Sequence, residues 1–260
     1  MNTTYTVTGF LVGGVVGMTG VGGGSLMTPI LVLLFGYAPQ TAIGTDLLFA
    51  CVTKSVGLTI HGRQGTVDWQ VLGRLSCGSI PAALATGLWM YGHPLPPQRS
   101  GALIGLIGAA IILTAVGLCC KPLLLRPGLI KWAGRQGSPM KHQVPFTVAA
   151  GAVVGVLVSL TSIGAGVLGT VMLIYLYPLR MRAARLVGTD IAHAIPLTLV
   201  AGVGNLFMGN VDLELLGGLL TGSIPGIILG SLAATRAPET LVRNALAAVL
   251  LLVGLKMALA

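Results

Sequence analysis

The stretch MTGVGGGSLMTP, Met18–Pro29, interrupts an apolar segment that extends from about Val7 to Phe35. A helix that restarts after such a run of glycines leaves several backbone N–H groups pointing toward its N-terminal end. Glycine lets a ligand approach the backbone closely, and the helix dipole adds partial positive charge at the same place. The stretch therefore predicts a broken helix whose second part begins at an anion-attracting end.

The same pattern recurs 144 residues later without a gap. The matching positions are Gly20 and Gly22 with Gly164 and Gly166, Gly44-Thr45-Asp46 with Gly188-Thr189-Asp190, Val67-Asp68 with Val211-Asp212, Gly78-Ser79-Ile80-Pro81 with Gly222-Ser223-Ile224-Pro225, and Arg99 with Arg243. The second interrupted segment extends from about Phe146 to Tyr177. The chain is therefore predicted to contain two copies of one unit.

Composition places both copies in a membrane. Hydrophobic residues make up 54% of the 260 residues and charged residues only 8%, and apolar stretches long enough to cross a bilayer recur throughout. The 15 lysines and arginines fall almost entirely in short connections, where they set orientation by the positive-inside rule. The sequence thus predicts the lipid bilayer as a partner and no nucleic acid, and it leaves a homo-oligomer open.

Each copy contains three plain spans after its interrupted segment. They lie near Ala38–Ile60, Gln70–Tyr91 and Gly101–Cys120 in the first copy and near Ala183–Leu206, Leu213–Ala234 and Leu241–Leu259 in the second. Residues 1–120 are expected to form the first transmembrane repeat, residues 121–145 a basic cytoplasmic linker, and residues 146–260 the second repeat. Met1–Thr8 contains no lysine or arginine, so we expect mature protein there rather than a leader.

The topology depends on whether the interrupted segments cross the membrane. If they do, the chain has eight plain spans and parallel repeats, with eight basic residues inside and six outside. If they are re-entrant hairpins, twelve lie inside and only Arg99 and Lys256 outside, with Lys54 counted in neither group. The 29 residues of the first segment would form a helix of about 43 Å, too long for one modestly tilted span. We therefore predict an all-α polytopic membrane protein with two inverted repeats, each a glycine-broken re-entrant helical hairpin plus three transmembrane helices.

The two glycine-rich breaks are the first candidates for a substrate site, because inverted repeats place such sites where broken helices converge. The alternative is that the glycines only permit close helix packing. Two breaks in register favour binding. The candidate residues are Gly22, Gly23, Gly24 and Ser25 in the first break and Gly164 and Gly166 in the second, with Thr45 and Thr189 as candidates for direct hydrogen bonds.

Asp46 and Asp190 lie about eight residues into their spans, roughly 12 Å below the membrane surface. Each is either a protonatable coupling residue or a structural carboxylate that accepts hydrogen bonds at the neighbouring break. Two bare carboxylates would repel an anion, so the structural role is favoured. His193 shares a helix face with Asp190, which suits a proton relay or, as we favour, an ordinary hydrogen bond.

Lys54 lies in mid-span and breaks the internal symmetry, because its counterpart in the second copy is Thr198. A lysine in hydrocarbon is costly unless it faces a cavity or a counter-ion. Lys54 is predicted either to bind the anionic substrate or to pair with Asp46 or Asp190.

No nucleophile–base pair and no cluster with metal-ligand spacing is evident, so we expect no catalytic residue, no metal, no cofactor and no enzyme activity. The four cysteines are expected to serve packing. Cys51 and Cys77 could also contact a sulfur-containing substrate.

These motifs resemble those of the TauE/SafE family of sulfite exporters: MTGVGGGSLMTP is followed by AIGTDLL, Ala42–Leu48, and the second copy has VGTDIA, Val187–Ala192. The resemblance covers nearly the whole chain, although Val167 and Leu168 stand where the first copy has Gly23 and Gly24. It implies a secondary transporter that exports sulfite, or an organosulfonate such as sulfoacetate, across the bacterial cytoplasmic (inner) membrane by alternating access.

An interior-negative potential favours the exit of each negative charge by about 2.3 kcal/mol per 100 mV, so export of an anion needs no coupled ion. Import would need coupling, with Asp46, Asp190 and His193 as the first candidates. The alternatives are an anion channel, a proton-coupled importer of another small anion, and a cation carrier that uses Asp46 and Asp190.

Overall fold

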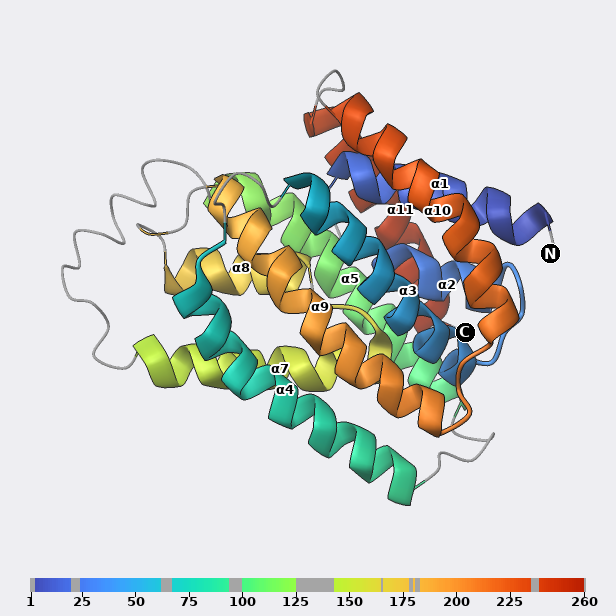
Figure 1. The fold of residues 1–260 in the computed structure, drawn as a ribbon, viewed down its shortest axis with the longest axis horizontal. Coiled ribbons are helices and arrows are strands. Elements are labelled where there is room, and N and C mark those ends of the chain that lie inside the picture. The colour runs from blue at the N-terminus through green and yellow to red at the C-terminus, as the bar shows by residue number, and fades with distance from the viewer. Residues whose placement is uncertain are drawn as a thin grey trace.

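A computed structural model describes residues 3–19, 24–61, 67–93, 100–124, 143–164, 166–177, 180, 183–234 and 239–259. All regular secondary structure in these ranges is helical. In chain order the helices are α1 (Thr3–Thr19), α2 (Gly24–Leu33), α3 (Pro39–His61), α4 (Trp69–Gly92), α5 (Ser100–Leu124), α7 (Gln143–Thr161), α8 (Val167–Leu176), α9 (Ala183–Phe207), α10 (Leu213–Ala234) and α11 (Glu239–Ala258). α1 and α10 lie at one edge of the bundle, α4 and α7 lie at the opposite edge, and α3 and α9 lie between them (Figure 1).

Six of the described helices are long and apolar enough to cross a membrane: α3, α4, α5, α7, α9 and α10. The apolar stretches of α1 and α11, Thr3–Met18 and Asn244–Ala258, are shorter. Large apolar side chains such as Leu84, Leu88 and Leu252 are exposed, as expected for a protein whose solvent is lipid. These features agree with the predicted all-helical, multi-pass membrane protein.

The helix bounds lie close to the predicted spans, with two differences. α5 continues to Leu124 and α7 begins at Gln143, so the segment between them is shorter than the predicted linker of residues 121–145. The arms of the interrupted segments are unequal, with 17 and 10 residues in α1 and α2 and 19 and 10 residues in α7 and α8. The first arm of each segment is therefore longer than a half-helix.

Each interrupted segment folds back on itself, so that the start of its first arm lies beside the end of its second. In the first segment, the hydroxyl groups of Tyr5 and Tyr37 lie 3.0 Å apart. In the second, the hydroxyl groups of Thr147 and Tyr177 lie 2.9 Å apart, and Gln143 Nε2 donates a 2.6 Å hydrogen bond to the carbonyl oxygen of Leu176. Both segments are therefore helical hairpins, and polar contacts join their two arms at the end away from the break.

The first helix of each copy packs on the other copy. α1 lies along α10 and α7 lies along α4, through glycines that bring the backbones together. A Cβ atom added at Gly13 would lie 2.5 Å from the carbonyl oxygen of Ser223, and one added at Gly155 would clash with the carbonyl oxygen of Ser79. Small residues at such helix contacts permit the close approach that drives association in lipid. The first helix of each copy is thus part of the packing of the other copy, and the two copies are not separate bundles.

Equivalent helices of the two copies run in opposite directions where they touch. Gly44 in α3 contacts Asn205 in α9, whereas Leu48, one turn later in α3, contacts Gly202, which lies earlier in α9. The α5–α11 pair shows the same reversal, while α1 and α10 run in the same direction. The antiparallel α3–α9 pair forms the centre of the bundle and carries the predicted ionisable residues.

Candidate functional site

Asp46 is fully buried in α3 and joins this helix to the first hairpin. Its Oδ2 accepts a 2.5 Å hydrogen bond from the hydroxyl of Thr28 in α2. The hydroxyl of Ser162, at the tip of the second hairpin, faces the same carboxylate. Neither Asp46 Oδ1 nor Ser162 Oγ has a hydrogen-bond partner among the described residues. Asp46 therefore lies where both hairpins meet.

Asp190 is the equivalent of Asp46 and is buried against the second hairpin, with 3% of its surface exposed. A Cβ atom added at Gly169, in α8, would lie 2.5 Å from Asp190 Oδ1. The position of Asp190 thus depends on the absence of a side chain at Gly169. The two carboxylates contact their hairpins in different ways, Asp46 through a hydroxyl and Asp190 through a bare backbone.

Lys54 lies deep in the same region, with only 5% of its surface exposed. It is attracted electrostatically by both Asp190 and Asp46, more strongly by Asp190. A buried lysine needs such compensation, because an isolated charge in a low-dielectric interior is strongly disfavoured. Among the described residues, Lys54 is the only buried lysine or arginine.

His193 in α9 is almost completely buried and binds a residue that the sequence analysis did not select. Its Nε2 lies 2.8 Å from the hydroxyl of Ser79 in α4. Its Nδ1 has no hydrogen-bond partner among the described residues. Ser79 belongs to the repeated Gly-Ser-Ile-Pro motif, and that repeat is the one sign in the sequence that points to it. Ser162 lies in the second break, where the sequence predicts anion binding, whereas Thr28 has no counterpart with the same side chain.

Thr45 and Thr189 accept equivalent hydrogen bonds from the opposite copy. The backbone N–H of Asp212 donates to Thr45 Oγ1 at 3.0 Å, and that of Asp68 donates to Thr189 Oγ1 at 2.9 Å. Both aspartates accept a bond from the first turn of the helix that they begin, α10 or α4, as N-cap residues do. The repeated Gly-Thr-Asp and Val-Asp motifs are therefore parts of one contact. These bonds use each threonine oxygen as an acceptor, whereas the predicted binding of an anion would use the threonine O–H groups as donors.

The glycines of the two breaks fall differently in the structure. Gly22 and Gly23 lie outside the described residues, while Gly24 begins α2 and Ser25 is buried. In the second break, Gly164 has a φ of +123°, a conformation that favours glycine. Gly166 precedes the first residue of α8.

Among the described cysteines, only Cys51 is buried; Cys77 and Cys119 are exposed. The expected packing role thus fits Cys51 alone, and Cys77 does not face the buried site. No group of three or more histidine, cysteine or acidic side chains that could hold a metal occurs in the described part of the chain.

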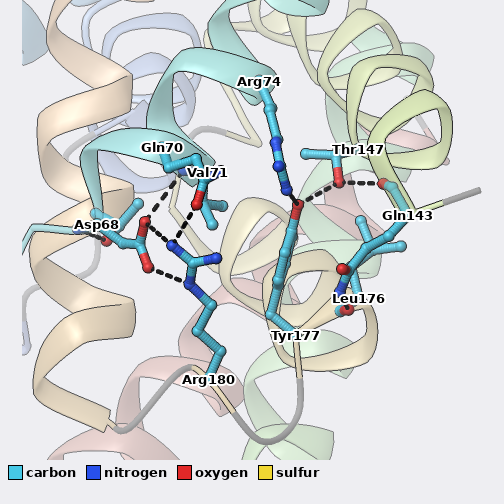
Figure 2. Close-up of polar contacts among 10 residues, drawn as sticks. Asp68, Gln70, Val71, Arg74, Gln143, Thr147, Leu176, Tyr177 and Arg180 are labelled. Atoms are coloured by element: carbon cyan, nitrogen blue, oxygen red, sulfur yellow. Dashed lines mark hydrogen bonds and ion pairs between the residues drawn. The ribbon is translucent and has the colours of Figure 1, made fainter. Parts of the chain in front are cut away.

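An ionic cluster joins the start of α4 to the connection between α8 and α9 (Figure 2). Arg180 donates two hydrogen bonds to the carboxylate of Asp68, from Nε at 2.6 Å and from Nη2 at 2.9 Å, and a third to Gln70 at 2.8 Å. Burial opposes ionisation of Asp68, but the bonds from Arg180 and the Val71 N–H outweigh it and lower the pKa of Asp68. We call Asp68, Gln70 and Arg180 the α4 latch.

Among the described residues, the α4 latch has no equivalent ion pair at the other end of the bundle. There, Gly36, with a φ of +70°, occupies the position that corresponds to Arg180. The start of α10 is instead closed by Tyr37, which lies beside Asp212 and bonds Tyr5. One end of the bundle is therefore closed by an ion pair and the other by neutral hydroxyl groups near a carboxylate.

Comparison with known proteins identifies the family. The family "Sulfite exporter TauE/SafE" matches residues 5–257. "Probable membrane transporter protein YjnA" of Bacillus subtilis (strain 168) is 38% identical over 262 residues, covering 99% of this chain and 100% of that protein. "Probable membrane transporter protein YdhB" of the same organism is 26% identical over 91% of this chain and 92% of its own length. "Probable membrane transporter protein MJ0441" of Methanocaldococcus jannaschii is 24% identical over 79% and 72%.

No solved structure gives a significant match. The family match spans both hairpins, the α3–α9 pair and the α4 latch, so it includes the whole of the candidate site. With buried ionisable residues inside a bundle of membrane-crossing helices, the chain belongs to the TauE/SafE sulfite exporter family of membrane transporters.

Proposed function

We propose that this protein is a secondary transporter that exports a small sulfur-containing oxyanion, sulfite or an organosulfonate such as sulfoacetate, across the bacterial cytoplasmic membrane. Family membership supports the class of substrate. One observation carries the assignment of the site: Lys54, Asp46 and Asp190 are buried between two helical hairpins that meet inside the bundle. Charged groups inside a membrane are costly and mark substrate or ion pathways.

The substrate would bind at the breaks that begin α2 and α8. Partial positive charge at two helix N-termini and the ammonium group of Lys54 would compensate an oxyanion. Ser25, Gly24, Gly164 and Gly166 line these breaks. The residues that would alternately expose the site are those of the two hairpins, because Asp46 lies against the first hairpin and Asp190 against the second.

The proposed topology has two inverted repeats, residues 1–120 and 146–260, with re-entrant hairpins α1–α2 and α7–α8. The ion pair between Asp68 and Arg180 supports it. If each hairpin returns to the side from which it enters, both residues lie on the side of the linker. If the chain instead had eight plain spans, the bilayer would separate them, and no ion pair would form. The antiparallel contact of the equivalent helices α3 and α9 supports the same conclusion.

In this topology the linker and the α4 latch face the cytoplasm, because that arrangement places twelve basic residues inside. The starts of α1 and α10 then face the outside. An anion bound from the cytoplasm would leave with the help of the membrane potential, worth about 2.3 kcal/mol per charge per 100 mV.

Flux measurements in proteoliposomes test the proposal. Labelled sulfite, sulfoacetate, sulfate and phosphate are compared under an imposed potential, with protein-free liposomes and Lys54→Met as controls. We expect flux of a sulfur oxyanion that rises with the potential and falls about 10- to 100-fold in Lys54→Met. If none of the four anions moves faster than in protein-free liposomes, the proposal is wrong.

A cation carrier is the second candidate, because the site contains two carboxylates and only one lysine. In that case Asp46 and Asp190 would bind the cation, as hard oxygen ligands do. Anion-independent sodium flux that is lost in both Asp46→Asn and Asp190→Asn would favour this function over anion export.

A further inference from the structure

We propose that Lys54 is one counter-ion shared by the two repeats, which pairs with Asp190 in one access state and with Asp46 in the other. The inference rests on the proposed transport function and inverted topology. It gives Asp46 and Asp190 a role beyond the structural one that the sequence favours.

The position of Lys54 relative to the internal symmetry is the first argument. Residues face one another across the α3–α9 contact in reversed order: Gly44 with Asn205, Leu48 with Gly202, and Cys51 with Thr198. Continued by less than one turn, this register brings Thr53 opposite Leu197, and these two positions are equivalent at the offset of 144 residues. The internal symmetry of the α3–α9 contact is therefore centred beside Lys54, within about one residue or 1.5 Å along the helix. We call this centre the symmetry point.

The charges around this point are the second argument. Asp46 and Asp190 are related by the same symmetry, so they lie on opposite sides of it, one toward each end of the bundle. Lys54 interacts with both and more strongly with Asp190. His193 is the other titratable neighbour of Lys54, and it is bonded to Ser79. One cation near the symmetry point and two equivalent carboxylates can form two alternative ion pairs, and in this structure the electrostatic attraction of Lys54 to Asp190 is the stronger of the two.

The connections from each carboxylate to the ends of the bundle are the third argument. Next to Asp190, Thr189 accepts a hydrogen bond from the N–H of Asp68, and the carboxylate of Asp68 bonds Arg180 in the α4 latch. Next to Asp46, Thr45 holds the N–H of Asp212. A change in the carboxylate that Lys54 pairs with would thus act on the start of α4 or on the start of α10. In this structure the stronger electrostatic attraction of Lys54 to Asp190 accompanies a formed α4 latch.

Moving the lysine to its equivalent position tests the proposal. Lys54→Met is expected to lower sulfite flux about 10- to 100-fold, the effect of losing one charge-assisted hydrogen bond. Lys54→Thr combined with Thr198→Lys transfers the charge across the symmetry point and is expected to restore most of the flux. The matched control combines Lys54→Thr with Ala201→Lys, which buries the same charge on α9 one turn away and is expected to stay inactive.

Hydrogen–deuterium exchange gives a readout that does not need transport. In the transposed variant the lysine lies closer to Asp46, so protection should fall at residues 67–75 of α4 and rise at residues 211–219 of α10 relative to wild type. Asp190→Asn should shift the two regions in the same sense, and Asp46→Asn in the opposite sense. These single substitutions serve if the transposed variant does not fold.

Exchange that changes equally at both ends in all variants, or a folded transposed variant as inactive as its control, would overturn the shared counter-ion. Absence of sulfite flux in the wild type together with opposite exchange shifts would instead refute the proposed substrate and keep the shared counter-ion.

Discussion

At the scale of single residues, the Gly-Thr-Asp motif makes two different structural contacts through adjacent side chains. Its threonine holds the first turn of a helix in the other copy, while its aspartate contacts a hairpin. The threonine oxygen thus fixes where the aspartate lies, because the two are adjacent on one rigid helix. A substitution at either position would affect both the ends and the centre of the bundle.

Gly169→Ala should impair transport without unfolding the protein. The added methyl group would lie 2.5 Å from Asp190 Oδ1, and the carboxylate can rotate away because it is the end of a side chain. Asp190 would then leave its position near Lys54. We expect sulfite flux to fall at least severalfold while the Tm in detergent changes by less than about 2 °C. Gly204→Ala is the control, since a Cβ atom there meets nothing within 4 Å.

The stabilising effect of the Asp68–Arg180 pair should disappear only in acid. Because the pKa of Asp68 is lowered, the pair contributes above the unfolded value of about 4 and is lost as the pH falls through the lower folded value. Arg180 is 41% exposed, so solvent screens the pair and its contribution stays below about 1 kcal/mol. The difference in Tm between wild type and Asp68→Asn should be constant from pH 8 to 5 and shrink below about pH 4. A difference that disappears near pH 6 would contradict this assignment.

The buried positions of Asp46, Asp190, Lys54 and His193 follow from the helical spans in which the sequence places them. Their partners do not. Thr28 and Ser79 come from other helices and Ser162 from the break between α7 and α8, and which hydroxyl reaches which charged group depends on how these elements pack. Sequence periodicity gives the faces of a helix but not its neighbours, so this part of the site was available only from the structure.

At the scale of helices, close backbone contact holds the two copies together. The helix pairs α1–α10 and α4–α7 are lined by glycines at which any side chain would meet the backbone of the partner helix. The offset of 144 residues identified the repeated glycines. It did not indicate that the first helix of each copy contacts the other copy, because a sequence repeat identifies equivalent positions but not which helices contact each other.

Gly78→Ala should destabilise the protein, in contrast to Gly73→Ala on the same helix. A Cβ atom at Gly78 would clash with the carbonyl oxygen of Val148 in α7, whereas one at Gly73 meets nothing within 4 Å. Overpacking of this kind costs about 1 to 3 kcal/mol. We expect a lower Tm in detergent for Gly78→Ala and an unchanged or higher Tm for Gly73→Ala, since alanine favours helix. Equal melting temperatures would show that α4 and α7 can separate at no cost.

At the scale of the whole molecule, the proposed inverted topology makes a prediction that does not depend on the substrate. Single cysteines at Tyr37 and Arg182, in a background without other cysteines, should react with a membrane-impermeant maleimide from opposite sides of the membrane. Tyr37 follows the first hairpin, and Arg182 follows the second, so each reports the side to which its hairpin returns. Labelling of both from the same side would exclude re-entrant hairpins and favour eight plain spans.

The multi-pass helical fold was predictable because composition and apolar length are read directly from the chain. The unequal arms of the hairpins were not, since the position of a break within an apolar segment depends on the helix that packs against it. α1, for example, continues along α10 through Gly13 and Gly17 before it ends at Thr19.

The interlocked packing of α1 on α10 has a consequence for biosynthesis. α10 is translated roughly 200 residues after α1, which takes about 10 to 40 s at 5 to 20 residues per second. During that time the glycine-lined face of α1 has no partner from its own chain and must be covered by lipid or by the insertion machinery. α1 thus reaches its final place long after it has been synthesised, and a ribosome that stalls before α10 leaves α1 without its partner helix.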